Sequence, residues 1–381
     1  MPVKTGNTQI LIASNTSWSV YNFRLPLVLA LIEKGWRVTV LSPRDEYTDR
    51  IVASGVTHRN LELETRGTNP LRELAAIRAI QRVYREIAPS VALQYTIKPV
   101  IYGSIAARRL HLPVINNITG LGTMFSGGLQ RMIARTLYRF AFARADLVFF
   151  QNPDDRDTFL RGGMIRPERV RLLPGSGVDT QRFTPRPRGS GAFTFLLLGR
   201  LLRDKGVEDF VSAARIVMTG RSGVRFVLLG RHDPADPSYA DPVLLRRAAM
   251  EGLVERIEHT DDVRPFIAAA DCVVLPSYYR EGVPRSLLEA ASMARPLIAA
   301  DCAGTREPVR NGVNGFLCRP RDPVDLAARM EAVLALPPNR LAMMGDASRR
   351  LAVERFDERV VIGAYLEAVE RLAGRPGTTR P

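Results

Sequence analysis

Residues 271–289, DCVVLPSYYREGVPRSLLE, hold the pattern that decides the fold: an apolar run, a short polar turn and a helical start. The run predicts a buried strand, and proline at 284 favours a helix that begins near Pro284 or Arg285. Glu281 then lies in the loop and Glu289 one to two turns inside the helix. Both carboxylates could face a ligand at the carboxyl end of a sheet, beside free helix N–H groups that hold anions. The alternative is that both are ordinary acidic residues at a helix start.

The same alternation of apolar run and helical stretch extends over most of the chain. Buried parallel strands have such continuous apolar sequences because helices cover both faces of their sheet. The alternation therefore predicts an α/β fold with crossover connections. The expected strands are Gln9–Ala13, Arg37–Leu41, Val91–Tyr95, Val114–Ile118, Asp146–Phe150, Phe193–Leu198, Val224–Leu229, Asp271–Leu275 and Pro296–Ala300.

One segment, Phe183–Gly191 (FTPRPRGSG), interrupts this alternation with proline, glycine and serine, which predicts a linker. Apolar residues at helical spacing in Asp357–Leu372 predict a last helix, and the residues after it have the composition of a flexible tail. The expected parts are a first domain over 1–185, a second over 192–355, a C-terminal helix over 356–372 that packs on the first domain, and a tail over 373–381.

Composition excludes several classes of protein. The chain has 381 residues, of which 46% are hydrophobic and 24% charged, a globular balance. Its longest apolar runs fall far short of the ~20 residues that a membrane-spanning helix needs, and three cysteines are too few for a disulfide scaffold. The net charge is +15: residues 1–185 hold 25 Lys and Arg against 14 Asp and Glu, and residues 186–381 hold 29 against 25. A basic first half attracts a nucleic acid, an acidic membrane or a phosphate-bearing substrate.

A second stretch that could hold functional residues is Leu198–Gly206, LGRLLRDKG, which follows the expected strand FTFLLL. Arg200 and Lys205 come directly after a glycine that ends this strand. Two cations at the carboxyl edge of a sheet suit a diphosphate. The alternative is a solvated basic loop, which is common in an arginine-rich chain.

The first strand is followed by Ser14–Pro26, SNTSWSVYNFRLP, which predicts a loop that faces a substrate. It lacks the G-x-G-x-x-G and G-x-x-x-x-G-K-[ST] fingerprints, which argues against Rossmann oxidoreductases and P-loop NTPases. Asn22 and Arg24 are its polar candidates, and Trp18 and Tyr21 accompany them. Packing of the aromatic residues is the alternative.

A basic amphipathic helix is expected over Gly128–Arg144. Arg131, Arg135 and Arg139 are four residues apart and form one stripe. Such a helix can lie on an anionic membrane, or it can turn its apolar face to the core and leave the arginines solvated. The histidines and cysteines show no metal-ligand spacing, so no metal is expected.

Taken together, these stretches resemble the retaining glycosyltransferases of family 4. The resemblance rests on GRLLRDKG, on EGVPRSLLEAASMARPLIAADCAGTREPV with its Glu-x7-Glu signature at Glu281 and Glu289, and on LLPGSGVDTQRF, DCVVLPS and NGVNGFL. It implies the GT-B fold, an α/β architecture of two facing Rossmann-like domains with a cleft between them. In the first half, YNFRLPL, LQYTIKPVIYGSIAA and NITGLGTMF are similar to enzymes that extend lipid-linked glycans, including bacterial N-acetylgalactosaminyltransferases that act on undecaprenyl-diphosphate-linked sugars.

The resemblance implies a role for each matching residue. Arg200 and Lys205 would bind the donor diphosphate, Glu281 would contact the donor sugar, and Glu289 would hydrogen-bond the ribose. The other donor-binding residues that it implies are Gly199, Gly282, Val283, Pro284 and Arg285. The acceptor-binding residues that we expect are Asn22, Arg24, Lys98 and Tyr102. Many relatives carry a histidine where Ile97 aligns, and this departure leaves the donor sugar open.

The leading expectation is a hexosyltransferase that needs no metal or other cofactor and moves N-acetylgalactosamine or a related hexose with retention of configuration. Its expected partners are a UDP-linked donor, a polyprenyl-diphosphate-linked saccharide and the anionic cytoplasmic face of the inner membrane, on which it would be peripheral. The alternatives are GDP-mannose or another donor, a nucleotide-sugar epimerase on the same fold, and a non-catalytic basic membrane-binding scaffold. No nucleic-acid-binding motif supports a nucleic-acid partner.

Overall fold

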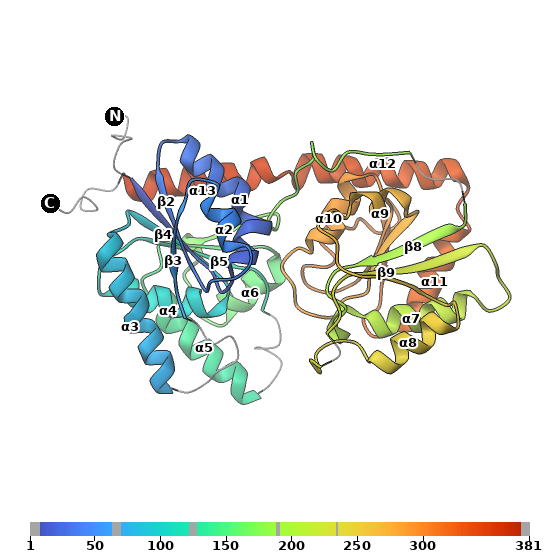
Figure 1. The fold of residues 1–381 in the computed structure, drawn as a ribbon, viewed down its shortest axis with the longest axis horizontal. Helices are drawn as coiled ribbons and strands as arrows, with labels where there is room; N and C mark the ends of the chain where they lie inside the picture. Colours follow the sequence, from blue (N-terminus) through green and yellow to red (C-terminus); the bar gives the residue numbers. More distant parts are fainter. Residues whose placement is uncertain (1–7, 63–69, 122–127, 188–190, 234, 375–381) are drawn as a thin grey trace. The chain divides into compact units, whose positions relative to one another are not determined.

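A computed structural model of the chain describes residues 8–62, 70–121, 128–187, 191–233 and 235–374. The chain divides into two compact units (Figure 1). One consists of Met1–Ser176 with Arg359–Pro381, and the other of Gly177–Glu358. Each unit is built on one parallel β-sheet, as the alternation of strand and helix predicts.

The first unit has seven parallel strands in the order β3-β2-β1-β4-β5-β6-β7. The order reverses at β1, whose Ile10 is aligned with Val38 of β2 on one side and with Val91 of β4 on the other. The strands are β1 Gln9–Ala13, β2 Arg37–Ser42, β3 Thr57–Asn60, β4 Val91–Tyr95, β5 Val114–Ile118, β6 Leu147–Phe150 and β7 Val170–Leu172. The helices before the second unit are α1 Ser17–Glu33, α2 Thr48–Val52, α3 Pro70–Ile87, α4 Ile97–Arg108, α5 Gly128–Phe142, α6 Pro153–Arg161 and the 3₁₀ turn η2 Pro167–Arg169.

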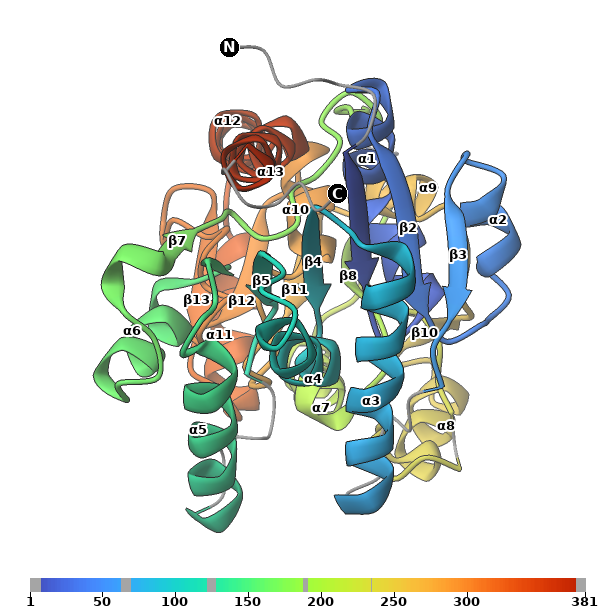
Figure 2. The ribbon, with the colours of Figure 1, turned by 90° about the vertical axis from the view of Figure 1, so that its left-hand side faces the viewer.

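Helices cover both faces of this first sheet. Buried side chains of α3, α4, α5 and α6 pack on one face, and those of α1 and α2 pack on the other. Figure 2 shows α3, α4 and α5 side by side. With both faces covered, the central strands are mostly apolar and show no polar alternation. Their buried amides, Gln94, Asn116 and Asn117, lie in the second half of β4 and β5.

The second unit has six parallel strands in the order β10-β9-β8-β11-β12-β13, and its order reverses at β8. The strands are β8 Phe193–Leu198, β9 Val224–Leu229, β10 Glu255–Ile257, β11 Cys272–Leu275, β12 Leu297–Ala300 and β13 Gly315–Cys318. The helices are η3 Arg203–Lys205, α7 Val207–Val217, α8 Pro242–Met250, α9 Arg264–Ala269, α10 Arg285–Ser292, α11 Pro323–Leu334 and α12 Pro338–Arg355.

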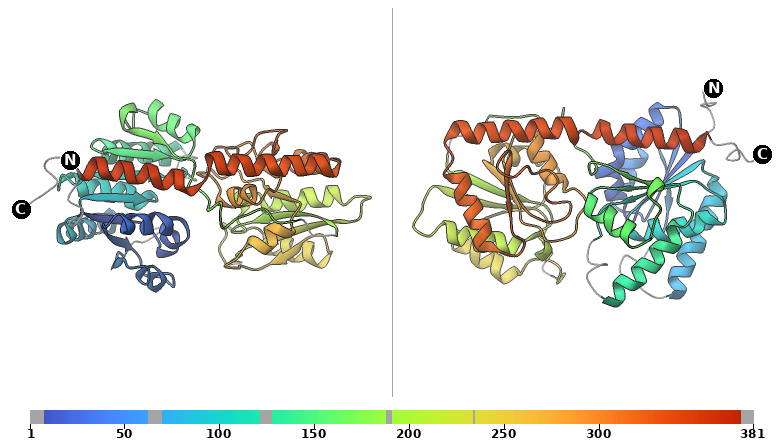
Figure 3. Two further views of the ribbon diagram at one scale, coloured as in Figure 1. Left: turned by 90° about the horizontal axis from the view of Figure 1, so that it is seen from above. Right: turned by 180° about the vertical axis from the view of Figure 1, so that it is seen from behind.

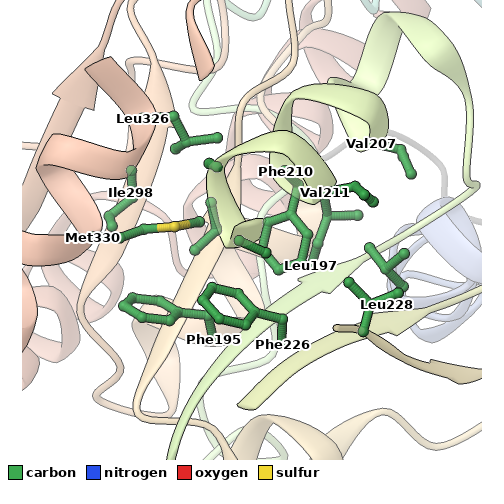
Figure 4. Packing of buried hydrophobic residues seen from close by; sticks show 14 of the residues in the cluster. Phe195, Leu197, Val207, Phe210, Val211, Phe226, Leu228, Ile298, Leu326 and Met330 are labelled. Carbon is green, nitrogen blue, oxygen red and sulfur yellow. The ribbon is translucent and has the colours of Figure 1, made fainter. Parts of the chain in front are cut away.

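Successive residues of β8 enter two different cores. Phe195 and Leu197 lie in the cluster that α7 and α11 cover, and Leu196 and Leu198 lie in the cluster on the other face. Figure 4 shows the first of these clusters, in which Phe195 stacks on Phe226 with their ring centroids 5.5 Å apart. Alternate residues of β8 thus fill the cores on the two faces of the second sheet.

The last helix, α13 (Glu358–Ala373), packs on the first sheet although it ends the chain (Figure 3). Tyr365 and Val369 are buried in the cluster that contains Ile10 and Ile12. Asn117 at the end of β5 donates a hydrogen bond to the Tyr365 hydroxyl over 2.6 Å. These contacts explain why residues from Arg359 on belong to the first unit.

The border between the units differs from the expected one at 185. The first unit ends at Ser176, because Val178 exchanges backbone hydrogen bonds with Phe356 and Glu358 of the second unit. Phe183 is also buried in the second unit's core. The Pro- and Gly-rich segment that begins at Phe183 is therefore packed against the second unit at its start. Of the expected tail over 373–381, Ala373 still belongs to α13, and residues 375–381 lie outside the described residues.

Candidate active site

The carboxyl edge of the second sheet brings together two loops that are far apart in the sequence. One follows β8 and the other follows β11, the two strands between which the strand order reverses. Ligands of α/β folds bind at such a point. Backbone N–H groups of Tyr278 and Tyr279 donate to the Asp204 carbonyl over 3.0 and 3.1 Å. The loops are thus tied together independently of any ligand.

Gly206 is the residue that permits this approach. It has φ of 73°, and a Cβ atom there would overlap the Pro276 carbonyl. Only glycine meets both conditions at low cost. Gly206 also caps α7, so one residue ends the basic loop, starts a helix and makes contact with the second loop.

Lys205 and Glu281 form an ion pair across the two loops. Lys205 Nζ lies 2.7 Å from Glu281 Oε2, and the Ser277 hydroxyl donates to Glu281 Oε1 over 2.7 Å. Only 17% of the lysine side chain and 13% of the glutamate side chain are exposed. The structure therefore brings together two of the three expected catalytic residues. It also adds Ser277, a hydroxyl residue two positions after the end of β11, which the sequence reasoning did not single out.

Arg200, the third expected catalytic residue, is exposed in the same loop. Its guanidinium makes no hydrogen bond or ion pair with any described residue. Its charge acts on Tyr279, where burial raises the pKa of the phenol and Arg200 opposes that rise. Gly199 before it has φ of 139° and turns the chain at the end of β8. At this edge Lys205 is therefore a paired cation, and Arg200 is an open one.

Helix α10 begins at Arg285 after Pro284, as the sequence predicts. Gly282, Val283 and Pro284 are buried ahead of it, and the Gly282 carbonyl lies so close to Gly304 that a side chain at 304 would overlap it. The loop that enters the helix is thus fixed in place. The first N–H groups of a helix have no partner within it, so its start favours an anion.

Glu289 lies one turn into α10 and accepts a hydrogen bond from Arg285 Nε over 3.0 Å. Burial raises the pKa of Glu289, while Arg285 and then Arg182 oppose that rise. Each glutamate of the Glu-x7-Glu pair therefore has its own cation, Lys205 for Glu281 and Arg285 for Glu289.

The expected acceptor residues of the first unit do not form one cluster. The prediction of a loop over Ser14–Pro26 is wrong: α1 already begins at Ser17, because Thr16 caps it by accepting from the Ser19 N–H over 3.1 Å. Asn22 and Arg24 therefore lie on a helix. The Asn22 amide donates to the Trp18 carbonyl one turn earlier, and Arg24 is buried.

Lys98 and Tyr102 lie together on α4. Lys98 Nζ is 2.7 Å from a Glu73 carboxylate oxygen of α3, and both side chains are less than one fifth exposed. The pKa of the Tyr102 phenol is raised, first by burial and then by Glu73. The sequence reasoning missed Glu73, which neutralises the charge for which Lys98 was chosen.

The arginine stripe is on the surface of α5. Arg131, Arg135 and Arg139 are exposed, as are Met132 and Thr136 between them. Ala134, Tyr138 and Phe142 form the buried face of the helix. Apolar side chains are also exposed on this helix, namely Met132, Ile133 and Phe140.

No three His, Cys, Asp or Glu side chains gather as a metal-binding group within the described ranges. Over the same ranges, no helix has the length and hydropathy that a membrane crossing requires.

Comparisons with known proteins agree with this architecture. Residues 9–152 match the family described as Glycosyl transferase 4-like, and residues 192–335 match Glycosyl transferases group 1. The chain is 25% identical to N,N'-diacetylbacillosaminyl-diphospho-undecaprenol alpha-1,3-N-acetylgalactosaminyltransferase of Campylobacter jejuni over 378 residues, which is 94% of this chain and 97% of the relative. It is 23% identical to UDP-Gal:alpha-D-GlcNAc-diphosphoundecaprenol alpha-1,3-galactosyltransferase of Escherichia coli over 276 residues, 68% and 69% of the two chains.

Solved structures share the fold. HepE of Anabaena in complex with UDP and glucose superposes with a TM-score of 0.79 at 19% identity, over 96% of this chain and 100% of that one. A glycosyltransferase from Rickettsia africae gives 0.78 at 14% identity, over 97% and 100%. The two Rossmann-like units therefore constitute the GT-B fold. The chain belongs to the GT-B glycosyltransferases, with a 4-like first domain and a group 1 second domain.

Proposed function

We propose that this glycosyltransferase moves N-acetylgalactosamine or a related hexose from a UDP-linked donor to a polyprenyl-diphosphate-linked saccharide. The transfer retains the anomeric configuration and needs no metal. The observation that carries the proposal is the ion pair of Lys205 and Glu281 beside Arg200, at the reversal point of the group 1 sheet.

The donor diphosphate is bound by Arg200 and Lys205. The departing nucleoside diphosphate gains negative charge, and cations held in place beforehand stabilise that charge in the transition state without reorganising. Glu281 keeps Lys205 in position and meets the sugar hydroxyls. The start of α10, with Gly199 and residues 282–285, supplies backbone contacts to the same phosphates and sugar, which is the role usually given to a helix N-terminus.

Retention is best explained by attack from the face that the leaving group departs. The acceptor hydroxyl oxygen forms a bond to the anomeric carbon, and the bond from that carbon to the diphosphate oxygen breaks. The electron pair stays on that oxygen, and the hydroxyl proton passes to the diphosphate. A double displacement needs a free carboxylate nucleophile, whereas the two oxygens of Glu281 are engaged by Lys205 and Ser277.

A UDP-linked donor is supported by the names of relatives. The Escherichia coli relative is named for UDP-Gal, and the Anabaena structure contains UDP. In this chain Glu289 accepts hydrogen bonds from the ribose hydroxyls, and Arg285 keeps the Glu289 carboxylate oriented. GDP-mannose is the alternative donor, and the donor panel described below separates the two.

A lipid-linked acceptor is supported by two relatives whose names include an undecaprenol diphosphate. The α5 stripe of Arg131, Arg135 and Arg139, together with exposed apolar side chains on the same helix, has the character of a surface that binds an anionic membrane. The enzyme is then peripheral on the cytoplasmic face of the inner membrane. Asn22, Lys98 and Tyr102 are our candidates for contacts with the acceptor sugar.

The test is a transfer assay with radiolabelled donors. UDP-GalNAc, UDP-GlcNAc, UDP-galactose, UDP-glucose and GDP-mannose are each incubated with undecaprenyl-diphosphate saccharides in the presence of EDTA. We expect a labelled lipid-linked product from one UDP-sugar, with an α-linkage by NMR if the donor is an α-anomer. Product only from GDP-mannose would contradict the UDP assignment, and product only after addition of a divalent cation would contradict the metal-free mechanism.

A further inference from the structure

Helix α1 turns one arginine toward the core. Its buried residues follow helical spacing and are Ser17, Val20, Arg24, Leu27, Val28 and Leu31. Arg24 is 5% exposed, in a stripe where apolar residues are normally found. A charge at such a position is costly unless it is paired and hydrogen-bonded.

The partner that Arg24 needs is absent from the described residues. Its guanidinium lies over the Tyr95 ring, 4.3 Å from the ring centroid. No described carboxylate forms an ion pair with it and no described acceptor hydrogen-bonds it. An aromatic ring offers attraction to one face of the cation, but it leaves the five N–H donors of a guanidinium unsatisfied.

A second buried arginine shows the contrast. Arg295 is 6% exposed, close to the value for Arg24. Its guanidinium donates to the carbonyl oxygens of Ile267, Ala268 and Arg186 over 2.8 to 2.9 Å. Arg295 is therefore a structural residue whose donors are satisfied within the fold, and Arg24 is not.

Arg24 also lies where a ligand is expected. It projects from α1, the helix that follows β1, onto Tyr95, the last residue of β4, and β1 and β4 are the neighbouring strands at which the first sheet reverses its order. Helical side chains tilt toward the helix N-terminus, which here lies at the carboxyl edge of the sheet. The next residue, Thr96, has φ of 67° without being glycine, and such strain clusters at functional sites.

The strand ends beside this position carry neutral amides rather than carboxylates. The Asn117 amide donates to the Tyr365 hydroxyl and accepts from the Gln151 amide, and both partners are uncharged. The Asn116 amide donates to the Ser104 hydroxyl, which donates to the Gln94 amide oxygen. These side chains are buried and already engaged with one another. They leave the positive charge of Arg24 uncompensated at the edge.

We propose that Arg24 is a binding residue for an oxyanion of the acceptor substrate, held by the planar N–H fork of its guanidinium. A guanidinium matches phosphate and carboxylate oxygens in bidentate geometry. The oxyanion is either the diphosphate of the lipid-linked acceptor or an ionised carboxylate on its sugar. That it belongs to the acceptor rests on the proposed function; that Arg24 binds an oxyanion does not.

The test is calorimetric titration of inorganic pyrophosphate and, separately, of glucuronate into the full chain at saturating UDP, which occupies the donor site. Arg24→Met keeps the length and volume of the side chain and removes its charge. We expect at least a tenfold weaker affinity for one of the two anions, and the anion affected identifies the source as phosphate or carboxylate. Arg24→Lys should weaken binding less than Arg24→Met.

Melting temperatures separate a binding role from a structural one. The ligand-free Arg24→Met protein should melt at or above the parent temperature, because a buried unpaired charge is removed. The control Arg295→Met should melt several degrees lower and bind both anions as the parent does. Equal anion affinity in parent and Arg24→Met, a parent that binds neither anion, or an Arg24→Met protein that melts as low as Arg295→Met or does not fold, would overturn the proposal. Absence of UDP binding in the parent would instead count against the proposed function, and the Arg24 comparison would then be made without UDP.

Discussion

Lys205 Nζ lies 2.7 Å from Glu281 Oε2, and this contact joins the loop after β8 to the loop after β11. The two residues are 76 positions apart in the sequence. Their pairing holds a positive charge at the reversal point of the second unit's sheet. Preorganised charge of this kind stabilises a departing diphosphate more effectively than a mobile side chain does.

Replacement of Lys205 by alanine should lower turnover by about 10²-fold, the usual effect of removing one preorganised group that stabilises transition-state charge. The variant should fold, because Ser277 still donates to Glu281 and the backbone hydrogen bonds between the two loops remain. The matched control is Lys34→Ala, which breaks another lysine–glutamate pair, with Glu370, at 3.0 Å. Steady-state transfer rates measure the effect. Equal rates in Lys205→Ala and Lys34→Ala would exclude a role of Lys205 in the reaction.

Gly206→Ala should separate the two loops. Gly206 and Gly220 share φ of 73°, but a Cβ atom at 206 would overlap the Pro276 backbone whereas Gly220 has nothing within 4 Å. Gly220→Ala should therefore cost only the backbone term, about 1–2 kcal/mol for a left-handed residue. Gly206→Ala should cost more and also weaken nucleotide binding. Urea unfolding and UDP titration of both variants check this. Similar losses of stability and of UDP affinity in the two variants would mean that the close approach of the loops does not contribute to either.

Glu289 should make the chain less stable as pH rises. Burial raises the pKa of Glu289 above its ordinary value of 4.5, so the folded chain holds this proton more tightly than the unfolded chain. The unfolded chain loses the proton first, and the free energy of unfolding therefore falls as pH rises from the ordinary value through the folded-state value. Glu289→Gln removes this term.

Melting temperatures of parent and Glu289→Gln between about pH 4 and about pH 7 measure the difference. The melting temperature of the variant relative to that of the parent should increase as pH rises. The half-exposed control Glu370→Gln should not show this trend. A difference that stays constant over this range would contradict the burial of an ionisable carboxyl at 289. In the same proteins, UDP affinity should fall for Glu289→Ala, since the ribose loses its acceptor.

Reversal of the α5 stripe should detach the chain from anionic vesicles. The triple variant of Arg131, Arg135 and Arg139 to glutamate changes the charge by about six, at roughly 1 kcal/mol per basic residue near an acidic surface. The control reverses Arg246, Arg340 and Arg350, three exposed arginines of the second unit. Sedimentation with phosphatidylglycerol vesicles at physiological salt compares them. Equal loss in both variants would indicate attraction by net charge rather than a docking helix.

The central strands could be predicted from the sequence, and the edge strands could not. β1, β4, β5, β8 and β9 have the bounds that their apolar runs predict. The strands that the sequence reasoning missed are β3 (THRN), β7 (VRL), β10 (ERI) and β13 (GFLC). Each of these is an edge strand of its sheet. An edge strand has one neighbour and less burial, so short polar sequences suffice for β3, β7 and β10. β13 is apolar, but its four residues are too short a run to mark a strand.

The places of the four charged candidates in the fold were predictable because each depends on one local segment. Arg200 and Lys205 follow one strand, and Glu281 and Glu289 flank one helix start, so each pair has a fixed place once the strand is known. Pairings across loops were not predictable, since nothing in the sequence indicates that Ser277 bonds Glu281 or that Glu73 neutralises Lys98. Arg24 was predicted in a loop over Ser14–Pro26 after the first strand, yet α1 already begins at Ser17 and turns Arg24 to the core.

The most direct test of the account is calorimetric titration of UDP, GDP, ADP and dTDP into the parent, Arg200→Ala and Lys205→Ala without added metal. The account predicts that the parent binds UDP in preference to the other three and that each variant binds UDP at least about tenfold more weakly, as the loss of one charged contact implies. A parent that binds none of the nucleotides, or variants that bind UDP as tightly as the parent, would contradict the assignment of this sheet edge as the donor site.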